Sequence, residues 1–361
     1  MRAPASARAG VAAARPCVRP NGRPRGDMRR GGDMYRRYVS PILMALALSL
    51  FAAAAWAVPE EWGHAPEVHV PAKVPGPAQA PAEVMLDDLG RPFPLPGRTP
   101  ARIVSMAPNV TEILFALGLG RRIVGATRFC DHPPEARAVP RIGGLVDPNI
   151  EIIQSLDPDL VVAFRGNPLR LVERVRRLGL PVFVLDIGGR IEDLFPLVAK
   201  IGRVTRTEAA AEALAADLRG RIGAVAAAVR SVASRPKVFA LLYGQGLWTC
   251  GGESYLDDLI SRAGGTNVAS ALPKKWALYK RERILRDDPD VVLILARTEA
   301  DFAAGRDRLL RTAGIGSVAA ARSGRIHAVD EDAASRFGPR LVEVLERAAR
   351  LLHPERFGGR P

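Results

Sequence analysis

The sequence contains little cysteine, little histidine and few aromatic residues. Its 361 residues include three cysteines and five histidines, and aromatic residues make up 6% of the chain. A bare metal ion needs several ligands that converge on one point, and so few candidate side chains do not supply them. The sequence also lacks a P-loop, a G-x-S-x-G nucleophile motif and an H-x-x-x-H pair. We therefore expect no catalytic residues, no resident metal and no cofactor.

One dinucleotide-like motif is present, in Gly314-Ile-Gly316-Ser-Val-Ala319. It follows a helical stretch, whereas the nucleotide-binding motif follows a strand, so we interpret it as a chance match. A secreted α/β enzyme remains the alternative from another functional class.

The net charge of +14 is unevenly distributed. Residues 1–57 contain ten arginines and two acidic residues and carry +8, which leaves +6 for residues 58–361. No basic patch interleaved with aromatic residues is found, so the charge does not indicate a nucleic-acid partner.

The N-terminal segment has the pattern of a secretory signal. A basic stretch begins at Met34, an apolar run covers Ile42 to Ala55, and Ala55-Trp-Ala57 resembles a cleavage site. Residues 1–57 are thus expected to be an extension and a cleaved signal peptide, with the true start at Met34. A membrane anchor is the alternative, but the apolar run is short for a bilayer span. The Pro-rich residues 58–83 predict an extended tether in an exported, periplasmic chain.

A nine-residue phrase occurs twice. Glu151-Ile-Ile-Gln-Ser-Leu-Asp157-Pro-Asp159 and Glu282-Arg-Ile-Leu-Arg-Asp-Asp288-Pro-Asp290 are each followed by an apolar run. Each phrase predicts a short helix that ends before proline, followed by a buried parallel strand. Two such phrases in register predict two lobes of similar build, and ligands favour the cleft between such lobes.

The remaining pattern supports an α/β class with two lobes. Apolar runs alternate with helical stretches, which predicts parallel sheets covered by helices. The expected strands are Ile103-Val104, Ile123-Val124, Leu160–Ala163, Val182–Leu185, Val238–Leu242, Val291–Leu295 and Ile326–Val329. Thr207 to Val232 keeps helical spacing and predicts one long backbone helix. We expect an N-terminal lobe at 84–205, the backbone helix at 206–234 and a C-terminal lobe at 235–361, with a possible hairpin at 84–95.

Four aromatic residues lie in stretches that resemble loops after or between expected strands. They are Phe129 and Phe164 in the first lobe, and Trp248 and Trp276 in the second. Open α/β sheets bind ligands at the carboxyl ends of their strands, and these side chains favour a large, flat, partly apolar ligand.

Two cysteines, Cys130 and Cys250, fall in different lobes. Export permits a disulfide, but this one would tie the cleft shut. We favour two separate thiols.

Several motifs resemble one family. Arg102-Ile-Val-Ser-Met-Ala-Pro-Asn-Val-Thr-Glu112, Asp131-His-Pro-Pro-Glu-Ala136, Asp157-Pro-Asp-Leu-Val-Val162 and Gly251-Gly-Glu-Ser-Tyr255 are similar to the substrate-binding proteins of metal-chelate ABC importers. The similarity covers about residues 84–352. It implies two α/β lobes, a backbone helix and a monomer that delivers a small-molecule chelate to a permease dimer in the inner membrane.

Within this family the corrinoid-binding members match best, which implies a ligand site. Phe164-Arg165-Gly-Asn167 resembles a ligand-lining loop, and Phe129, Trp248 and Trp276 fall on ligand-lining positions. A further ligand-contacting loop matches Asp332, Ala333, Ala334, Ser335 and Arg336, with the two alanines in place of an aromatic pair. The resemblance predicts capture of a corrinoid such as vitamin B12. A ferric siderophore or haem is the alternative, kept open by Arg165, Arg281 and Arg336.

The family also docks its permease through one glutamate on each lobe. Glu282 matches the glutamate of the second lobe, whereas the matching stretch of the first lobe, Asn167-Pro-Leu-Arg170, contains no acid. Glu173 is the nearest candidate there.

Overall fold

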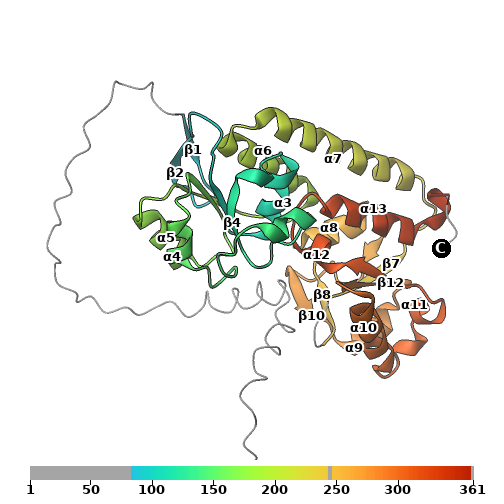
Figure 1. Ribbon diagram of the computed structural model, residues 1–361. Helices are drawn as coiled ribbons and strands as arrows, with labels where there is room; N and C mark the ends of the chain where they lie inside the picture. Colours follow the sequence, from blue (N-terminus) through green and yellow to red (C-terminus); the bar gives the residue numbers. More distant parts are fainter. Residues whose placement is uncertain (1–82, 243–245, 359–361) are drawn as a thin grey trace, which may run out of the picture. The chain divides into compact units, whose positions relative to one another are not determined.

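The computed structural model describes residues 83–242 and 246–358. The predicted signal peptide, the start at Met34 and nearly all of the predicted tether lie outside the described residues. The described chain holds two four-stranded sheets and two two-stranded ones (Figure 1).

The first four-stranded sheet has the order β4-β3-β5-β6 and is parallel throughout. Its strands and helices all lie within residues 103–205. They are β3 (Ile103–Ser105), α3 (Pro108–Ala116), β4 (Ile123–Ala126), α4 (Ile150–Ser155), β5 (Leu160–Phe164), α5 (Leu169–Arg177), β6 (Val182–Leu185) and α6 (Leu194–Thr205). The expected hairpin is also present, as β1 (Val84–Leu86) antiparallel to β2 (Pro92–Pro94). Two ion pairs, Asp87 with Arg176 and Asp88 with Lys200, join its turn to this lobe.

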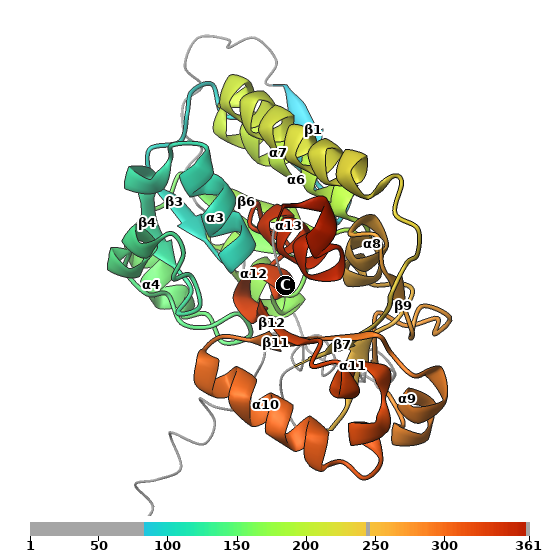
Figure 2. The same ribbon diagram turned by 90° about the vertical axis from the view of Figure 1, so that its right-hand side faces the viewer.

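The second four-stranded sheet has the order β12-β11-β7-β9 and is also parallel. Its elements, together with a separate antiparallel ribbon of β8 and β10, follow residue 236. They are β7 (Lys237–Leu241), β8 (Trp248–Cys250), α8 (Tyr255–Arg262), β9 (Thr266–Asn267), β10 (Trp276–Leu278), α9 (Arg281–Asp287), β11 (Val291–Ala296), α10 (Glu299–Arg311), α11 (Ala319–Arg322), β12 (Ile326–Asp330), α12 (Glu331–Ser335) and α13 (Leu341–Leu352). Figure 2 shows α10 and α11 on one side of this sheet, and α8 and α13 on the other. Short 3₁₀ turns in the two lobes are η1 (Gly120–Arg122), η2 (Pro134–Ala138), η3 (Ile191–Asp193), η4 (Ile315–Ser317) and η5 (Pro354–Arg356).

The central strands of the two large sheets are largely apolar because both faces of each sheet are buried. Side chains that alternate along a strand enter different core clusters, as β-strand geometry requires. In β11, Leu293 joins the same cluster as residues of the first lobe, whereas Val292 and Ile294 face a cluster confined to the second. One hydrophobic cluster therefore runs through both lobes, and the expected strands are all confirmed.

The repeated phrase forms the same structure twice. Asp157 and Asp288 both have a φ of 43°, so each leaves the right-handed helical region directly before its proline. Two residues later, the Asp159 carboxylate accepts backbone hydrogen bonds from Ala101 (2.7 Å) and Arg102 (2.8 Å). Asp290 accepts one from Lys237 (2.7 Å) in the same way. Each phrase thus attaches its own strand to the preceding chain, and the predicted internal repeat is confirmed.

The long helix is α7 (Glu208–Val229), which packs against α6 and α13 (Figure 1). Its buried face is Ala211, Ala215, Leu218, Ile222, Val225 and Val229. The Arg221 guanidinium donates two hydrogen bonds to Glu346 of α13, at 2.8 and 2.9 Å. A helix that packs against both α6 and α13 connects the two lobes.

Candidate ligand cleft and lobe junction

In the first lobe, the half-buried Phe164 ends β5 at the carboxyl edge of the sheet. The buried Asn167 holds this loop: its Oδ1 accepts from the backbone N–H of Phe164 (2.8 Å). Its Nδ2 donates to the carbonyls of Met106 (3.1 Å) and Leu145 (2.9 Å). Three loops at the carboxyl edge are therefore joined by one side chain. The resemblance contained Asn167 within its motif but did not indicate this role.

Gly166 lies close to the Phe164 ring. A Cβ atom at position 166 would lie 2.2 Å from Cε1 of the Phe164 ring, so the ring lies directly over this glycine. The second aromatic residue of this lobe, Phe129, follows β4 and lies half-buried under the Arg128 guanidinium, which is 5.7 Å from its ring centroid.

The second lobe presents its aromatic residues differently. Trp248 and Trp276 do not lie in loops, as the sequence predicted, but in the antiparallel ribbon of β8 and β10. The register pairs Trp276 with Cys250 and Leu278 with Trp248. Because side chains alternate between faces of a strand, both indoles and Leu278 share one face of the ribbon. Leu278 is 59% exposed and was missed by sequence reasoning, although its spacing from Trp276 is the signal.

An aromatic chain continues from the ribbon toward the other lobe. Trp276 meets the edge of Tyr255 at 6.0 Å between ring centroids, and Tyr255 meets Phe337 at 4.9 Å. Phe337 is fully buried and has a φ of 51°, a conformation that a bulky residue adopts at a cost. The chain ends next to Arg336, which contacts the first lobe.

Buried ion pairs form the lobe junction. Arg340 donates two hydrogen bonds to Glu112 of α3, at 2.7 and 3.2 Å. Arg336 pairs with Asp131 of the first lobe, with Asp332 (3.0 Å) and with Glu112 (3.7 Å). The Glu112 side chain is 3% exposed, so a charge is desolvated here and depends on both arginines. Burial alone would raise the pKa of Asp131, but the hydrogen bond and charge of Arg336 lower it below its ordinary value.

The segment predicted as a ligand-contacting loop is helical. Its residues Asp332 to Ser335 belong to α12, and Asp330 caps this helix by accepting from the N–H of Ala333 (2.9 Å). Ala333 and Ala334 are buried in the core, and the Ser335 hydroxyl donates to the carbonyl of Glu331 (2.6 Å). Within the segment, only Asp332 and Arg336 direct charged groups to the junction.

The three arginines that left an anionic ligand as an alternative are each paired with a carboxylate. Arg165 pairs with Asp186 (2.9 Å) and Arg281 with Glu282 (2.9 Å). Arg336 has the three carboxylate partners described above.

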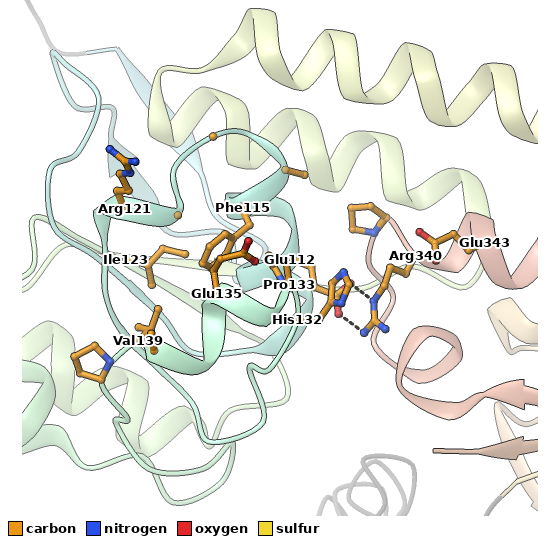
Figure 3. Close-up of a pocket in the computed structure, with 16 residues that line it drawn as sticks. Glu112, Phe115, Arg121, Ile123, His132, Pro133, Glu135, Val139, Arg340 and Glu343 are labelled. Atoms are coloured by element: carbon orange, nitrogen blue, oxygen red, sulfur yellow. Dashed lines mark hydrogen bonds and ion pairs between the residues drawn. The ribbon is translucent and has the colours of Figure 1, made fainter. Parts of the chain in front are cut away.

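A separate hollow of about 840 Å³ lies beside the junction. Figure 3 shows Phe115, Ile123 and Val139 on its first-lobe wall, and the Glu112–Arg340 pair between the lobes. None of the four predicted ligand-lining aromatic residues borders it. Its charged residues outside the Glu112–Arg340 pair are solvent-exposed at Arg121, Glu135 and Glu343, so this hollow does not have the character of the aromatic site.

The two predicted docking glutamates differ in their surroundings. Glu282 lies in the first turn of α9 with a 67% exposed side chain. Glu173 is largely enclosed and pairs with Arg91 (2.8 Å) and Arg176 (3.1 Å). Glu151, which the repeat aligns with Glu282, lies in the first turn of α4 with a 70% exposed side chain. Sequence reasoning placed these two glutamates in register but did not use the equivalence.

Cys130 and Cys250 are separate free thiols, as predicted, and both are buried. Burial raises the pKa of Cys130 above its ordinary value, and it raises the pKa of Cys250 to about 12. Both are therefore protonated and unreactive near neutral pH.

Within residues 83–242 and 246–358, no group of three or more His, Cys, Asp or Glu side chains is arranged to hold a metal ion. In the same part of the chain, no helix combines the length and the apolar character needed to cross a membrane.

A family model described as periplasmic binding protein matches residues 103–333, from the first residue of β3 into α12. The chain belongs to this family. This periplasmic binding protein is 31% identical to a cobalamin-binding protein of Halobacterium salinarum over 259 residues, which are 70% of each chain.

Solved structures agree with the fold. The periplasmic vitamin B12 binding protein BtuF of Vibrio cholerae is 25% identical with a TM-score of 0.62, over 71% of this chain and 98% of that one. The periplasmic heme-binding protein RhuT from Roseiflexus sp. RS-1 is 27% identical with a TM-score of 0.65, over 72% of this chain and all of that one. The predicted family and the two-lobed α/β class are confirmed.

Proposed function

We propose that this periplasmic binding protein captures a corrinoid and delivers it to an ABC importer. The main supporting observation is that Trp248, Trp276 and Leu278 share one face of the ribbon. This face offers two indoles and an exposed apolar side chain to one ligand. Phe129 and Phe164 lie at the carboxyl edge of the other lobe's sheet. Such aromatic surfaces suit a large macrocycle with a partly apolar face.

Three arginines bear on the choice between a corrinoid and a ferric siderophore. Arg165, Arg281 and Arg336 are each paired with a carboxylate, so none of the three offers an unpaired charge to an anionic chelate, which favours a corrinoid. Haem is the second candidate, supported by the similarity to RhuT. The corrinoid or haem is cargo here, and no catalytic role or resident cofactor is proposed.

Docking to the permease dimer is proposed to use Glu282 and Glu151. Both are exposed and occupy equivalent positions in the first turns of α9 and α4. Glu173 is replaced in this role because its side chain is only 25% exposed and is held by two arginines, whereas Glu282 and Glu151 each pair with one arginine and are 67% and 70% exposed. Charged rim contacts of this kind set orientation and association rate more than affinity. Export by a cleaved signal peptide to the periplasm, and function as a monomer, complete the proposal.

A titration tests the function directly. Cyanocobalamin is added to the purified full chain while tryptophan fluorescence and heat are followed, with haemin and ferric siderophores as competitors. We expect saturable cyanocobalamin binding with quenching of the indoles. Saturable binding of a ferric chelate without any response to cyanocobalamin would overturn the corrinoid assignment.

A further inference from the structure

Asn109 is a buried side chain with an unused hydrogen-bond donor. It lies in the first turn of α3 and is 4% exposed. Its Nδ2 is buried, and no described residue accepts a hydrogen bond from it. Buried polar groups are nearly always paired, because an unpaired one loses its hydration without compensation. An exception inside a folded lobe therefore needs an explanation.

The position of Asn109 relates it to the cleft. It precedes Glu112 by three residues on α3, so the two side chains are neighbours on one helix face. Glu112 contacts Arg336 and Arg340 of the second lobe, so Asn109 shares the face that α3 presents to the junction. Because α3 follows the carboxyl end of β3, Asn109 is one turn nearer to the ligand edge of the sheet than Glu112. A second buried donor of this junction, Arg336 Nε, also has no partner among the described residues.

We propose that Asn109 donates its Nδ2 hydrogen bond to a neutral carbonyl oxygen on the captured ligand and so helps to select an amide-bearing macrocycle. This inference rests on the proposed function and adds a specificity-determining residue to it. Corrinoids carry carboxamides around the ring, whereas haem carries two carboxylates. Because the Nδ2 atom is buried, the proposal requires a small displacement of α3 that lets the ligand carbonyl reach it.

The charge of the junction favours the neutral acceptor. Four carboxylates, Glu112, Asp131, Asp330 and Asp332, contact three guanidiniums, those of Arg297, Arg336 and Arg340, within this cluster. A carboxylate on the ligand would add another negative charge beside the buried Glu112, and like charges at short range repel strongly where water is excluded. A carboxamide oxygen accepts the same hydrogen bond without that repulsion.

A matched residue shows what a structural asparagine looks like in this fold. Asn167 is equally buried, at 4% exposure, and makes the three hydrogen bonds that join the loops of the first lobe. Asn109 makes no side-chain hydrogen bond to any residue in the described ranges. Asn167 therefore has a structural role, whereas Asn109 is the side chain that we assign to the ligand.

The test compares Asn109→Leu with Asn167→Leu in the full chain, with Asn109→Ala as a second variant. Thermal unfolding is measured without ligand, and binding is measured with cyanocobalamin and with haemin. Leucine of similar volume at position 109 removes an unpaired buried donor, so we expect an unchanged or raised melting temperature. Asn167→Leu should lower it, because three hydrogen bonds are lost. Asn109→Leu and Asn109→Ala should each weaken cyanocobalamin binding roughly three- to tenfold, as loss of a neutral hydrogen bond does, and leave any haemin affinity within twofold.

Three outcomes overturn the inference. The first is a melting temperature that falls for both Asn109 variants as it does for Asn167→Leu, and the second is an unchanged affinity for cyanocobalamin. The third is an equal loss for both ligands, which removes the preference for a neutral acceptor. Failure of the proposed function is read separately, from the parent chain: if the parent does not bind cyanocobalamin, the corrinoid assignment fails. In that case the melting temperatures measured without ligand still show whether the side chain at position 109 is needed for folding.

Discussion

The two lobes share a scaffold but present their aromatic residues in different ways. Both contain the same helix, Asp-Pro-Asp turn and parallel strand. The first lobe offers Phe129 and Phe164 near strand ends, and Asn167 holds the backbone of Phe164. The second adds an antiparallel ribbon outside its parallel sheet, and this ribbon carries both tryptophans.

This difference separates scaffold from ligand surface. The buried parallel strands are constrained on both faces, so changes there disturb packing. One face of the ribbon is partly exposed, since Leu278 on it is 59% exposed although Cys250 is buried, and exposed side chains can differ there at lower cost. A buried asparagine supports the ligand edge in both lobes, since Asn267 donates to the Cys250 carbonyl of the ribbon (2.9 Å) as Asn167 does to the loops of the first lobe. The lobes thus use one type of support for two types of surface.

The largest expected effect comes from breaking the junction that joins the lobes. Glu112→Gln removes the buried charge on which Arg336 and Arg340 depend, and loss of one partner of a buried ion pair costs about 3 kcal/mol of unfolding free energy. Urea unfolding measures it. Glu212→Gln is the control, because Glu212 is exposed on α7 and pairs with no described residue. Equal stability of the two variants would show that the junction contributes nothing to the fold.

The next effect compares the two aromatic surfaces. Trp276→Ala should weaken corrinoid binding roughly ten- to a hundredfold, because burying an indole against the ligand contributes about 1.5–3 kcal/mol. Phe164→Ala should cost less, since a smaller ring is removed from the first lobe. Calorimetric titration with cyanocobalamin measures both. A larger loss for Phe164→Ala at equal folding would mean that the first lobe, and not the ribbon, dominates recognition.

The third prediction tests whether the exposed glutamates Glu282 and Glu151 play equivalent roles in docking to the permease. Glu282→Arg and Glu151→Arg should each impair uptake while leaving ligand affinity within about twofold, because both carboxylates are exposed rim groups. Uptake of labelled corrinoid by cells and binding by the purified chain are measured in parallel. Glu173→Gln is the control that should lower stability through its two arginine partners and leave docking intact. A collapse of affinity in Glu282→Arg would assign Glu282 to the ligand site.

The smallest effect is a pH dependence specific to the second lobe. Burial, followed by the charges of Arg325 and Arg347, lowers the pKa of His327 in β12 below its ordinary value. The unfolded chain therefore binds the proton more readily, and stability should fall as pH decreases through about 6.5 toward the folded-state pKa. His327→Gln should remove this slope in thermal unfolding between pH 7.5 and 5. The strands of the first lobe's parallel sheet contain no histidine, so an unchanged slope in the variant would assign the pH dependence to groups outside the sheets.

Sequence patterns predicted the scaffold well because its rules are local. Proline after Asp157 and Asp288 ends each helix, and continuous apolar runs mark strands buried on both faces. The same rules failed at the ribbon, where Trp248 and Trp276 were read as loop residues. The two ribbon strands have three residues each and lie far apart in the sequence, so their pairing cannot be recognised from either one alone. Helix α12 was missed because it has only five residues.

The sequence by itself determined the two lobes, their strands, the connecting helix and the family, because these depend on spacing along the chain. Only the tertiary structure decided the junction and the state of each site residue. Arg336 and Asp131 are 205 positions apart, and Arg340 and Glu112 are 228 positions apart. No periodicity links residues at such separations. Their pairing depends on how α3 and the segment before α13 are placed in space, as does the isolation of Asn109, and placement is a property of packing and not of local pattern.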